Sequence, residues 1–120
     1  MGHFIKMACE CEHCKKIDDA NNSQSGSIIT FVNRLAREIK KEYPDVLIHT
    51  FAYQYSRKTP SAVVPDENVI VRLCNIECSW SNSILELANK NPNCESAHFY
   101  SDLLNWSKIT NRLYIWDYSV

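Results

Sequence analysis

Three apolar segments constrain the fold of this 120-residue chain more than any other feature of its sequence. They span Val46–Tyr53, Asn68–Ile76 and Arg112–Tyr118, and helical or irregular stretches separate them. Each segment is rich in β-branched and aromatic residues, and none alternates cleanly between apolar and polar positions. Strands that are covered on both faces have this composition, so the three segments favour a parallel sheet.

A helix is predicted before the first segment. Its apolar positions recur at intervals of three or four residues, at Ile28, Val32, Leu35, Ile39 and Tyr43. Ser25 or Ser27 can cap its start by accepting a hydrogen bond from a free N–H of the first turn. Pro44 ends it, because the residue before a proline is pushed out of the helical region.

A second helix is predicted within Ser96–Thr110, and a shorter helical stretch at Ile84–Asn89. The resulting order is helix, strand, irregular crossover, strand, helix, strand. This order is α/β with about three parallel strands and two main helices. We therefore expect a single α/β domain or barrel fragment over residues 1–120, with a cysteine-rich loop at 1–24 and the α/β core at 25–120.

The third segment is not followed by another helix, which an α/β unit normally places there. We therefore expect the chain to be part of a larger sheet or a (β/α) barrel. A sheet with an open edge can also pair with a second copy of the chain, so self-association through that edge is a further expectation.

The charge balance excludes two classes of partner. The net charge is -1, from 13 basic and 14 acidic residues. Nucleic-acid binders and proteins that bind anionic membranes need a basic patch, so we expect neither nucleic acid nor membrane as a partner. No segment is apolar for long enough to span a bilayer, and the start of the chain lacks a signal-peptide pattern. The compartment stays open.

Polar and aromatic side chains follow each of the three segments. Ligands of parallel α/β folds bind beyond the carboxyl ends of the strands, so these side chains are the candidate site. Aromatic rings can stack on sugar rings, while amides and an arginine can bind hydroxyl or carboxylate groups. The candidate substrate-binding residues are Tyr53, Gln54, Tyr55, Arg57, Trp80, Trp116 and Tyr118.

Glu77 and Asp117 are the acids at the strand ends and form the candidate catalytic pair. Two carboxyl groups about 5 Å apart would indicate a retaining glycosidase, and about 9 Å an inverting one. Asp66 and Glu67 precede the second strand, so they are expected at the opposite edge of the sheet and are set aside.

Six cysteines leave the chemistry of the thiols open. Cys9, Cys11 and Cys14 form a C-x-C-x2-C cluster, which offers one C-x2-C pair to a structural zinc ion but no second pair. Zinc could recruit His13 or a distant thiol; disulfides and free thiols are the alternatives. The cluster is expected to be a structural loop and not an active site. Cys74 and His49 are expected inside strands as buried residues.

Four blocks of the sequence carry a resemblance to a known family. They are CECEHCKKIDD, the stretch from SGSIITFVNRL to FAYQYSRKTP, NVIVRLCNIECSW and RLYIWDY. In this order they resemble a bacterial family, often encoded in Bacteroidetes, that is known as a domain of unknown function. The family is grouped with glycoside hydrolases of the (β/α)8-barrel type, near α-glucuronidases and hexosaminidases. The chain departs from the pattern at ECSWSNSILEL, where members continue with ECC and a proline-containing turn.

The resemblance implies that the chain is about half of a barrel and belongs to a glycoside hydrolase-like protein. Glu77 and Asp117 would then supply the acid and the base, and Arg57 could bind a uronate carboxylate. The family's habit of secretion implies a periplasmic or cell-surface parent. The alternative is a non-enzymatic structural or interaction module that is stabilised by a cysteine-bound metal or by disulfides.

Overall fold

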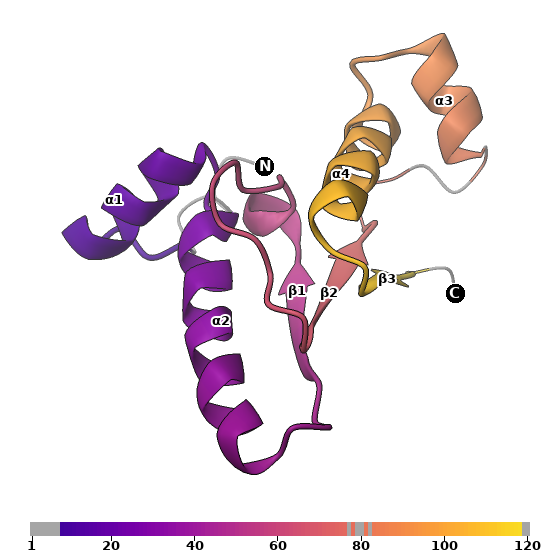
Figure 1. The fold of residues 1–120 in the computed structure, drawn as a ribbon. Coiled ribbons are helices and arrows are strands. Elements are labelled where there is room, and N and C mark those ends of the chain that lie inside the picture. Colours follow the sequence, from indigo (N-terminus) through magenta and orange to yellow (C-terminus); the bar gives the residue numbers. More distant parts are fainter. Residues whose placement is uncertain (1–7, 77, 79–80, 82, 119–120) are drawn as a thin grey trace.

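The computed structural model describes residues 8–76, 78, 81 and 83–118. Three parallel strands form one sheet in the order β1-β2-β3, as Figure 1 shows. The elements are α1 (Glu12–Asn21), α2 (Ser25–Glu42), β1 (Ile48–Ala52), the 3-10 turn η2 (Gln54–Ser56), β2 (Val69–Cys74), α3 (Ile84–Lys90), α4 (Glu95–Ile109) and β3 (Leu113–Trp116). The predicted α/β class and its parallel strands are therefore confirmed.

Each strand is shorter than its apolar segment, because the strands pair only over a limited register. Ile48 of β1 lies opposite Val69 of β2, and Ala52 lies opposite Leu73. β3 pairs with β2 only from Leu113 onwards. Apolar residues beyond these positions have no ladder partner, so composition alone overestimates strand length.

The expected loop at residues 1–24 is wrong over its second half, where the chain forms α1. The Cys11 sulfur caps this helix by accepting from the N–H of Cys14 at 3.4 Å. Asn22 ends it in the left-handed region with φ 55°, which asparagine tolerates better than most residues. The segment is polar and lacks a clear apolar stripe, so the periodicity that predicts helices did not signal it.

Neither predicted serine is the N-cap of α2. The helix begins at Ser25 itself, after Gln24, whose side chain makes no capping bond. The buried Asp18 of α1 accepts from the N–H of Ser27 at 2.7 Å instead. A residue nine positions upstream therefore satisfies a free donor of the first turn, which local capping rules could not anticipate.

The apolar stripe of α2 is rotated relative to the prediction. Ile29, Val32 and Ala36 are buried, whereas Leu35 and Tyr43 are exposed. The polar side chain of Asn33 sets this orientation, because it donates to the carbonyl of Val64 and accepts from the N–H of Asp66. The irregular crossover between η2 and β2 spans residues 57–68. Hydrogen bonds to this crossover thus decide which face of α2 meets the sheet.

The core lies on one face of the sheet. Residues of α2 and α4 pack there against the inward-pointing side chains of β1 and β2. Trp106 of α4 is fully buried, and its indole N–H donates to the carbonyl of Arg57 at 2.7 Å. The predicted helix at Ser96–Thr110 is thereby confirmed as α4, with bounds Glu95–Ile109.

The other face of the sheet is partly open to solvent, contrary to the expectation of strands covered on both sides. Phe51, Tyr114 and Trp116 are 48%, 52% and 40% exposed. His49, expected in the core, is exposed on this face and accepts from the Nε of Arg72 at 2.8 Å. Only the central strand β2 is buried along nearly its whole length, because it has neighbours on both sides.

No described helix is both long and apolar enough to cross a membrane.

Candidate functional site

A cavity of about 250 Å³ lies at the carboxyl edge of the sheet, on its open face. Cys74 ends β2 and pairs in register with Trp116, which ends β3. Phe51 of β1 points to the same face, and so does Tyr53, because the backbone stays extended beyond the strand. The lining residues are Phe51, Tyr53, Cys74, Trp116 and Tyr118.

The rings of the open face are held against one another. Phe51 and Trp116 meet edge to face with centroids 5.3 Å apart, and the guanidinium of Arg72 lies 5.3 Å from the Trp116 ring. Tyr53 and Tyr118 are tilted by 32° at 6.5 Å. Such contacts fix ring orientation beyond simple burial. We call the following set the aromatic face: His49, Phe51, Tyr53, Arg72, Tyr114, Trp116 and Tyr118.

The cavity is lined by neutral hydrogen-bonding groups. Burial raises the pKa of the Cys74 thiol above its usual value. Burial, and next the nearby Cys74, also raise the pKa of the Tyr118 hydroxyl. Both groups therefore keep their protons at neutral pH. They can donate or accept hydrogen bonds, but neither is an ionised nucleophile there.

Asn75 connects the ends of β2 and β3 beside the cavity. Its buried side chain donates to the Asp117 carboxylate at 3.1 Å and accepts from the N–H of Tyr118 at 3.3 Å. The amide thus uses both of its ends to hold β3 in place. Asp117, one of the two predicted catalytic acids, is exposed and oriented by this bond.

The structure gathers only some of the predicted binding residues. Tyr53, Trp116 and Tyr118 line the cavity together. Gln54 and Tyr55 lie in η2 and do not line it. Glu77 and Trp80 lie outside the described residues, so their predicted roles stay predictions.

Arg57 does not line the cavity, and its guanidinium forms ion pairs with Glu95 and Asp102 of α4. Its Nε donates to Asp102 at 2.8 Å and its Nη2 to Glu95 at 3.3 Å. Burial raises the pKa of the Asp102 carboxyl by more than the adjacent guanidinium lowers it. These contacts join η2 to α4. The contact with substrate that the sequence predicts for Arg57 stays a prediction.

Sequence reasoning missed four residues around the cavity: Phe51, Arg72, Cys74 and Asn75. The sequence does carry a pattern that could have found the aromatic residue among them. Aromatic residues occupy every second position, at 51 and 53 and at 114, 116 and 118, and alternate positions of a strand point to the same face. Alternation of rings along two strands indicates one aromatic side. The interpretation of the segments as apolar on both faces did not use this alternation.

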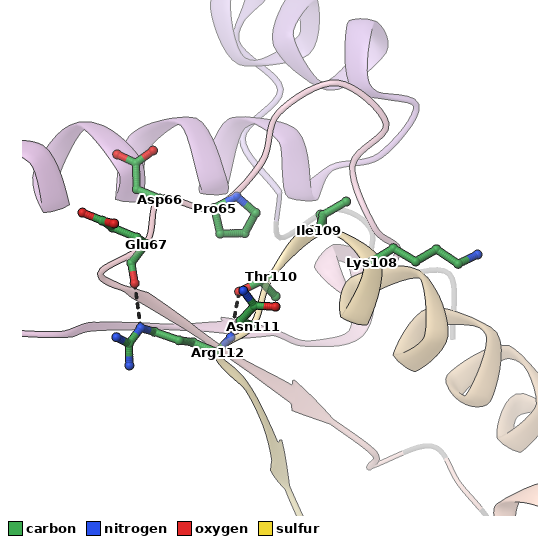
Figure 2. Close-up of a pocket in the computed structure, with 8 residues that line it drawn as sticks. All are labelled: Pro65, Asp66, Glu67, Lys108, Ile109, Thr110, Asn111 and Arg112. Atoms are coloured by element: carbon green, nitrogen blue, oxygen red, sulfur yellow. Dashed lines mark hydrogen bonds between the residues drawn. The ribbon is translucent and has the colours of Figure 1, made fainter.

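A second cavity, of about 480 Å³, lies at the opposite edge of the sheet (Figure 2). Asp66 and Glu67 line it, at the amino-terminal edge where the sequence placed them. Asp66 pairs with Arg37 at 2.7 Å, Glu67 pairs with Lys40, and the carbonyl of Glu67 accepts from Arg112 at 2.6 Å. These contacts tie α2, β2 and the start of β3 together.

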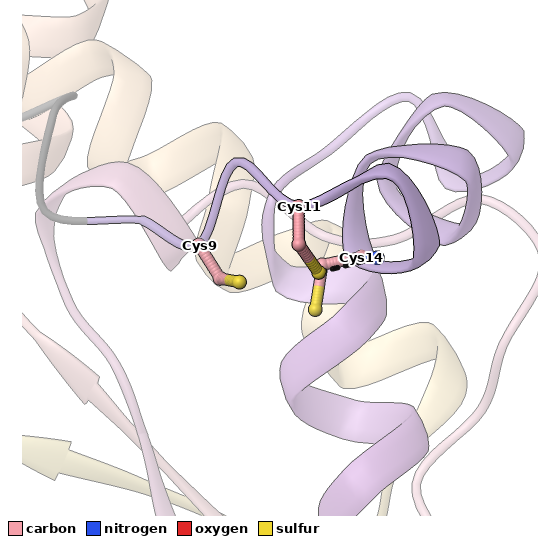
Figure 3. A group of neighbouring side chains, drawn as sticks. All are labelled: Cys9, Cys11 and Cys14. Atoms are coloured by element: carbon pink, nitrogen blue, oxygen red, sulfur yellow. Dashed lines mark hydrogen bonds between the residues drawn. The ribbon is translucent and has the colours of Figure 1, made fainter.

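The thiols of Cys9, Cys11 and Cys14 meet at the start of α1, as Figure 3 shows. Their sulfur atoms lie within 4.8 Å of one another, close enough to hold a metal ion. Hydrogen bonding, first from the Cys14 N–H, lowers the pKa of Cys11. Hydrogen bonds to Cys11 and Cys9 raise the pKa of Cys14 to about 12. None of the distant thiols and not His13 belongs to this group.

The fold and the cavity define an α/β protein with a parallel sheet that is covered by helices on one face and lined with aromatic rings on the other. Comparison with protein families makes the assignment specific. Residues 5–120 match the family described as a domain of unknown function, DUF4838, and the chain belongs to this family. No curated protein and no solved structure matches the chain.

Proposed function

We propose that the chain forms part of the sugar-binding site of a glycoside hydrolase-like (β/α)-barrel protein. The observation that carries the proposal is the cavity at the carboxyl edge, where four aromatic rings and neutral donors converge. Apolar pockets with a few polar groups are typical ligand sites. Its volume of about 250 Å³ is smaller than most such pockets, so a single sugar ring is the unit that it would hold.

The chemistry of the lining fits a sugar better than a charged ligand, because none of the residues that line the cavity is acidic or basic. The rings of Tyr53, Trp116 and Tyr118 offer apolar faces, while the two tyrosines also present hydroxyl groups. A pyranose carries both apolar C–H faces and hydroxyl groups, so it uses both kinds of surface. The guanidinium of Arg72 is already engaged with the Trp116 ring and with His49.

The strand order supports placement in a barrel. Sequence neighbours are also neighbours in the sheet, and α2 and α4 pack on the same face. In (β/α)8 barrels the helices form the outer layer, and the sites lie at the carboxyl ends of the strands. The aromatic face would then point to the barrel interior, with Tyr53, Trp116 and Tyr118 at its catalytic end.

Catalysis in the whole protein would use Asp117, oriented by Asn75, together with Glu77. An acid pair on either side of a glycosidic bond is the usual requirement for hydrolysis. The chain alone would bind sugar weakly and turn it over slowly or not at all, because barrel sites draw residues from several strands.

The proposal is tested by titrating the chain with neutral sugars, N-acetylated sugars and uronates, followed by two-dimensional NMR of the tryptophan side chains. We expect one sugar class to shift the Trp116 indole signal, and Trp116→Ala to weaken binding by at least about tenfold. Tyr43→Ala is the matched control, because Tyr43 is an exposed aromatic residue at the C-terminal end of α2 and does not line the cavity.

Two results would contradict the proposal. In one, no sugar class shifts the Trp116 signal. In the other, a sugar binds equally well to the wild-type chain and to Trp116→Ala. Glu77→Gln and Asp117→Asn should leave binding nearly unchanged while abolishing hydrolysis in the full-length protein, because they remove acid–base groups and not ring surface.

The alternative function, a non-enzymatic module held together by a cysteine-bound metal or by disulfides, rests on the cluster of three thiols. We place it second, because the hydrogen bonds of Asp18 and Asn21 attach α1 to the rest of the fold without using any thiol. Cysteine-to-serine variants of the cluster would unfold the chain under this alternative.

A further inference from the structure

The cluster of Cys9, Cys11 and Cys14 is not explained by sugar binding. None of the three residues lines the carboxyl-edge cavity. Cys9 and Cys11 are exposed and Cys14 is partly exposed, so the sulfur atoms are accessible to solutes. Figure 3 shows the three side chains pointing toward a common point beside the first turn of α1.

The distances suit a shared metal ion. Three thiolates bound to one ion at about 2.3 Å lie about 4 Å from one another. The observed sulfur atoms already lie within 4.8 Å of one another. Small side-chain rotations that move each sulfur by less than about 1 Å would therefore bring them to the spacing of bound thiolates. The backbone N–H of Cys14 already orients the Cys11 sulfur.

The donor set selects the kind of ion. All three donors are sulfur, and within the described residues no histidine or carboxylate completes the group. Thiolates prefer soft ions such as Cu(I) and Zn(II), whereas Mg²⁺ and Ca²⁺ need oxygen ligands. Structural zinc sites normally have four protein ligands, so three leave one coordination position open.

The fold around the cluster has its own supports. Asn21 accepts from the N–H groups of Ala62 and Val63 at 3.0 and 2.8 Å, and Ser25 donates to the carbonyl of Lys58 at 2.6 Å. These bonds hold α1 and the start of α2 against the crossover. A metal at the thiols is therefore not needed to keep the two helices in place.

We propose that Cys9, Cys11 and Cys14 form an accessible three-thiolate site that binds one soft metal ion with an open coordination position and is not required for folding. Each thiol that coordinates the ion loses its proton to solvent, so binding releases protons. The open position would let the ion pass to another ligand, which a closed structural site prevents.

The test is a titration of the fully reduced chain with Cd(II), followed by the ultraviolet charge-transfer band of thiolate-bound cadmium. We expect the band to saturate at one ion per chain. Cys9→Ser, Cys11→Ser and Cys14→Ser should each weaken binding by at least about tenfold. A thermal melt with excess chelator should leave the melting temperature within about 2 °C.

Cys94→Ser is the matched control. Cys94 caps α4 as Cys11 caps α1, with its sulfur accepting from the N–H of Ala97 at 3.3 Å, but it lies outside the thiol group. Binding should be unchanged in this variant. The proposal is overturned if no band forms, if the band survives the triple serine variant, or if Cys94→Ser removes it. It is also overturned if chelator collapses the fold, which would identify a structural site.

Discussion

Single residues hold this structure together by satisfying polar groups that belong to distant segments. Asn21 illustrates this role, because its buried amide pairs with Ile17 of its own helix and with two N–H groups of the crossover. Asn75 does the same between β2 and β3. Buried donors without partners are costly, so such amides determine where loops can run.

Asp102 provides a prediction on pH. Its pKa is raised above the unfolded value of 3.8, so the folded chain binds more protons than the unfolded chain between the two pKa values. This carboxyl therefore lowers the stability of the fold as the pH rises through that window. In Asp102→Asn the amide can still accept from Arg57, but the titration is removed.

We expect the unfolding free energy of the wild type, minus that of Asp102→Asn, to fall as the pH is raised from about 3 to 7. Urea unfolding at a series of pH values measures this difference, and contributions from other carboxyl groups cancel between the two proteins. A difference that rises with pH would show that the ion pair with Arg57 outweighs the burial of Asp102.

Among the elements, the contact between α1 and α2 depends on a glycine. A Cβ atom added at Gly26 would lie 2.7 Å from the Cβ of Asn21 and 2.9 Å from its Nδ2. Because Asn21 also holds Ala62 and Val63, any displacement of its side chain weakens the attachment of the crossover.

We expect Gly26→Ala to lower the unfolding free energy by about 1–3 kcal/mol, as overpacking does elsewhere. At an unhindered helical position the same change raises stability by about 0.5–1 kcal/mol, so the sign of the effect is diagnostic. Ser27→Ala, in the same turn, should change it by less than about 0.5 kcal/mol.

Chemical denaturation of Gly26→Ala, Asn21→Ala and the double variant completes the test. The two changes should not add, since both act through the Asn21 side chain. A stabilising Gly26→Ala, or additive effects, would show that the two helices are less closely packed than the structure indicates.

At the scale of the whole molecule, the exposed aromatic face determines how the chain is expected to interact with other molecules. Phe51 and Tyr114 lie on the outer strands with about half of their surface accessible to solvent. Contiguous apolar surface of this kind usually marks an interaction site. In the barrel that we propose, further strands would cover this side.

We expect the isolated chain to bind a hydrophobic dye and to self-associate at micromolar concentration through this face. Phe51→Thr combined with Tyr114→Thr should reduce both effects, because threonine keeps the strand propensity and removes the rings. Sedimentation velocity and dye fluorescence measure the change. Phe31→Gln, on an exposed site of α2, is the control. A wild-type chain that stays monomeric and binds no dye would contradict this expectation.

The sequence alone identified the elements whose signal is local. The strands, the helix at α2 and the helix at α4 follow from runs of apolar residues and from their spacing, and parallel pairing follows from their alternation with helices. The ends of the strands also located the aromatic residues Tyr53, Trp116 and Tyr118. These features depend on residues that are close together in the sequence, so they can be predicted without knowing the tertiary structure.

Features that depend on pairing between distant segments became visible only in the folded chain. The register between β2 and β3 placed Cys74 beside Trp116 and put the aromatic rings on the open face of the sheet. Asp102 of α4 formed an ion pair with Arg57. The polar helix α1 formed because Asp18 and Asn21 found partners in α2 and in the crossover. The two residues of such a contact lie as many as 45 positions apart, as Arg57 and Asp102 do, so no local sequence pattern encodes it. Packing and hydrogen bonding between distant segments select one orientation from those that the periodicity allows.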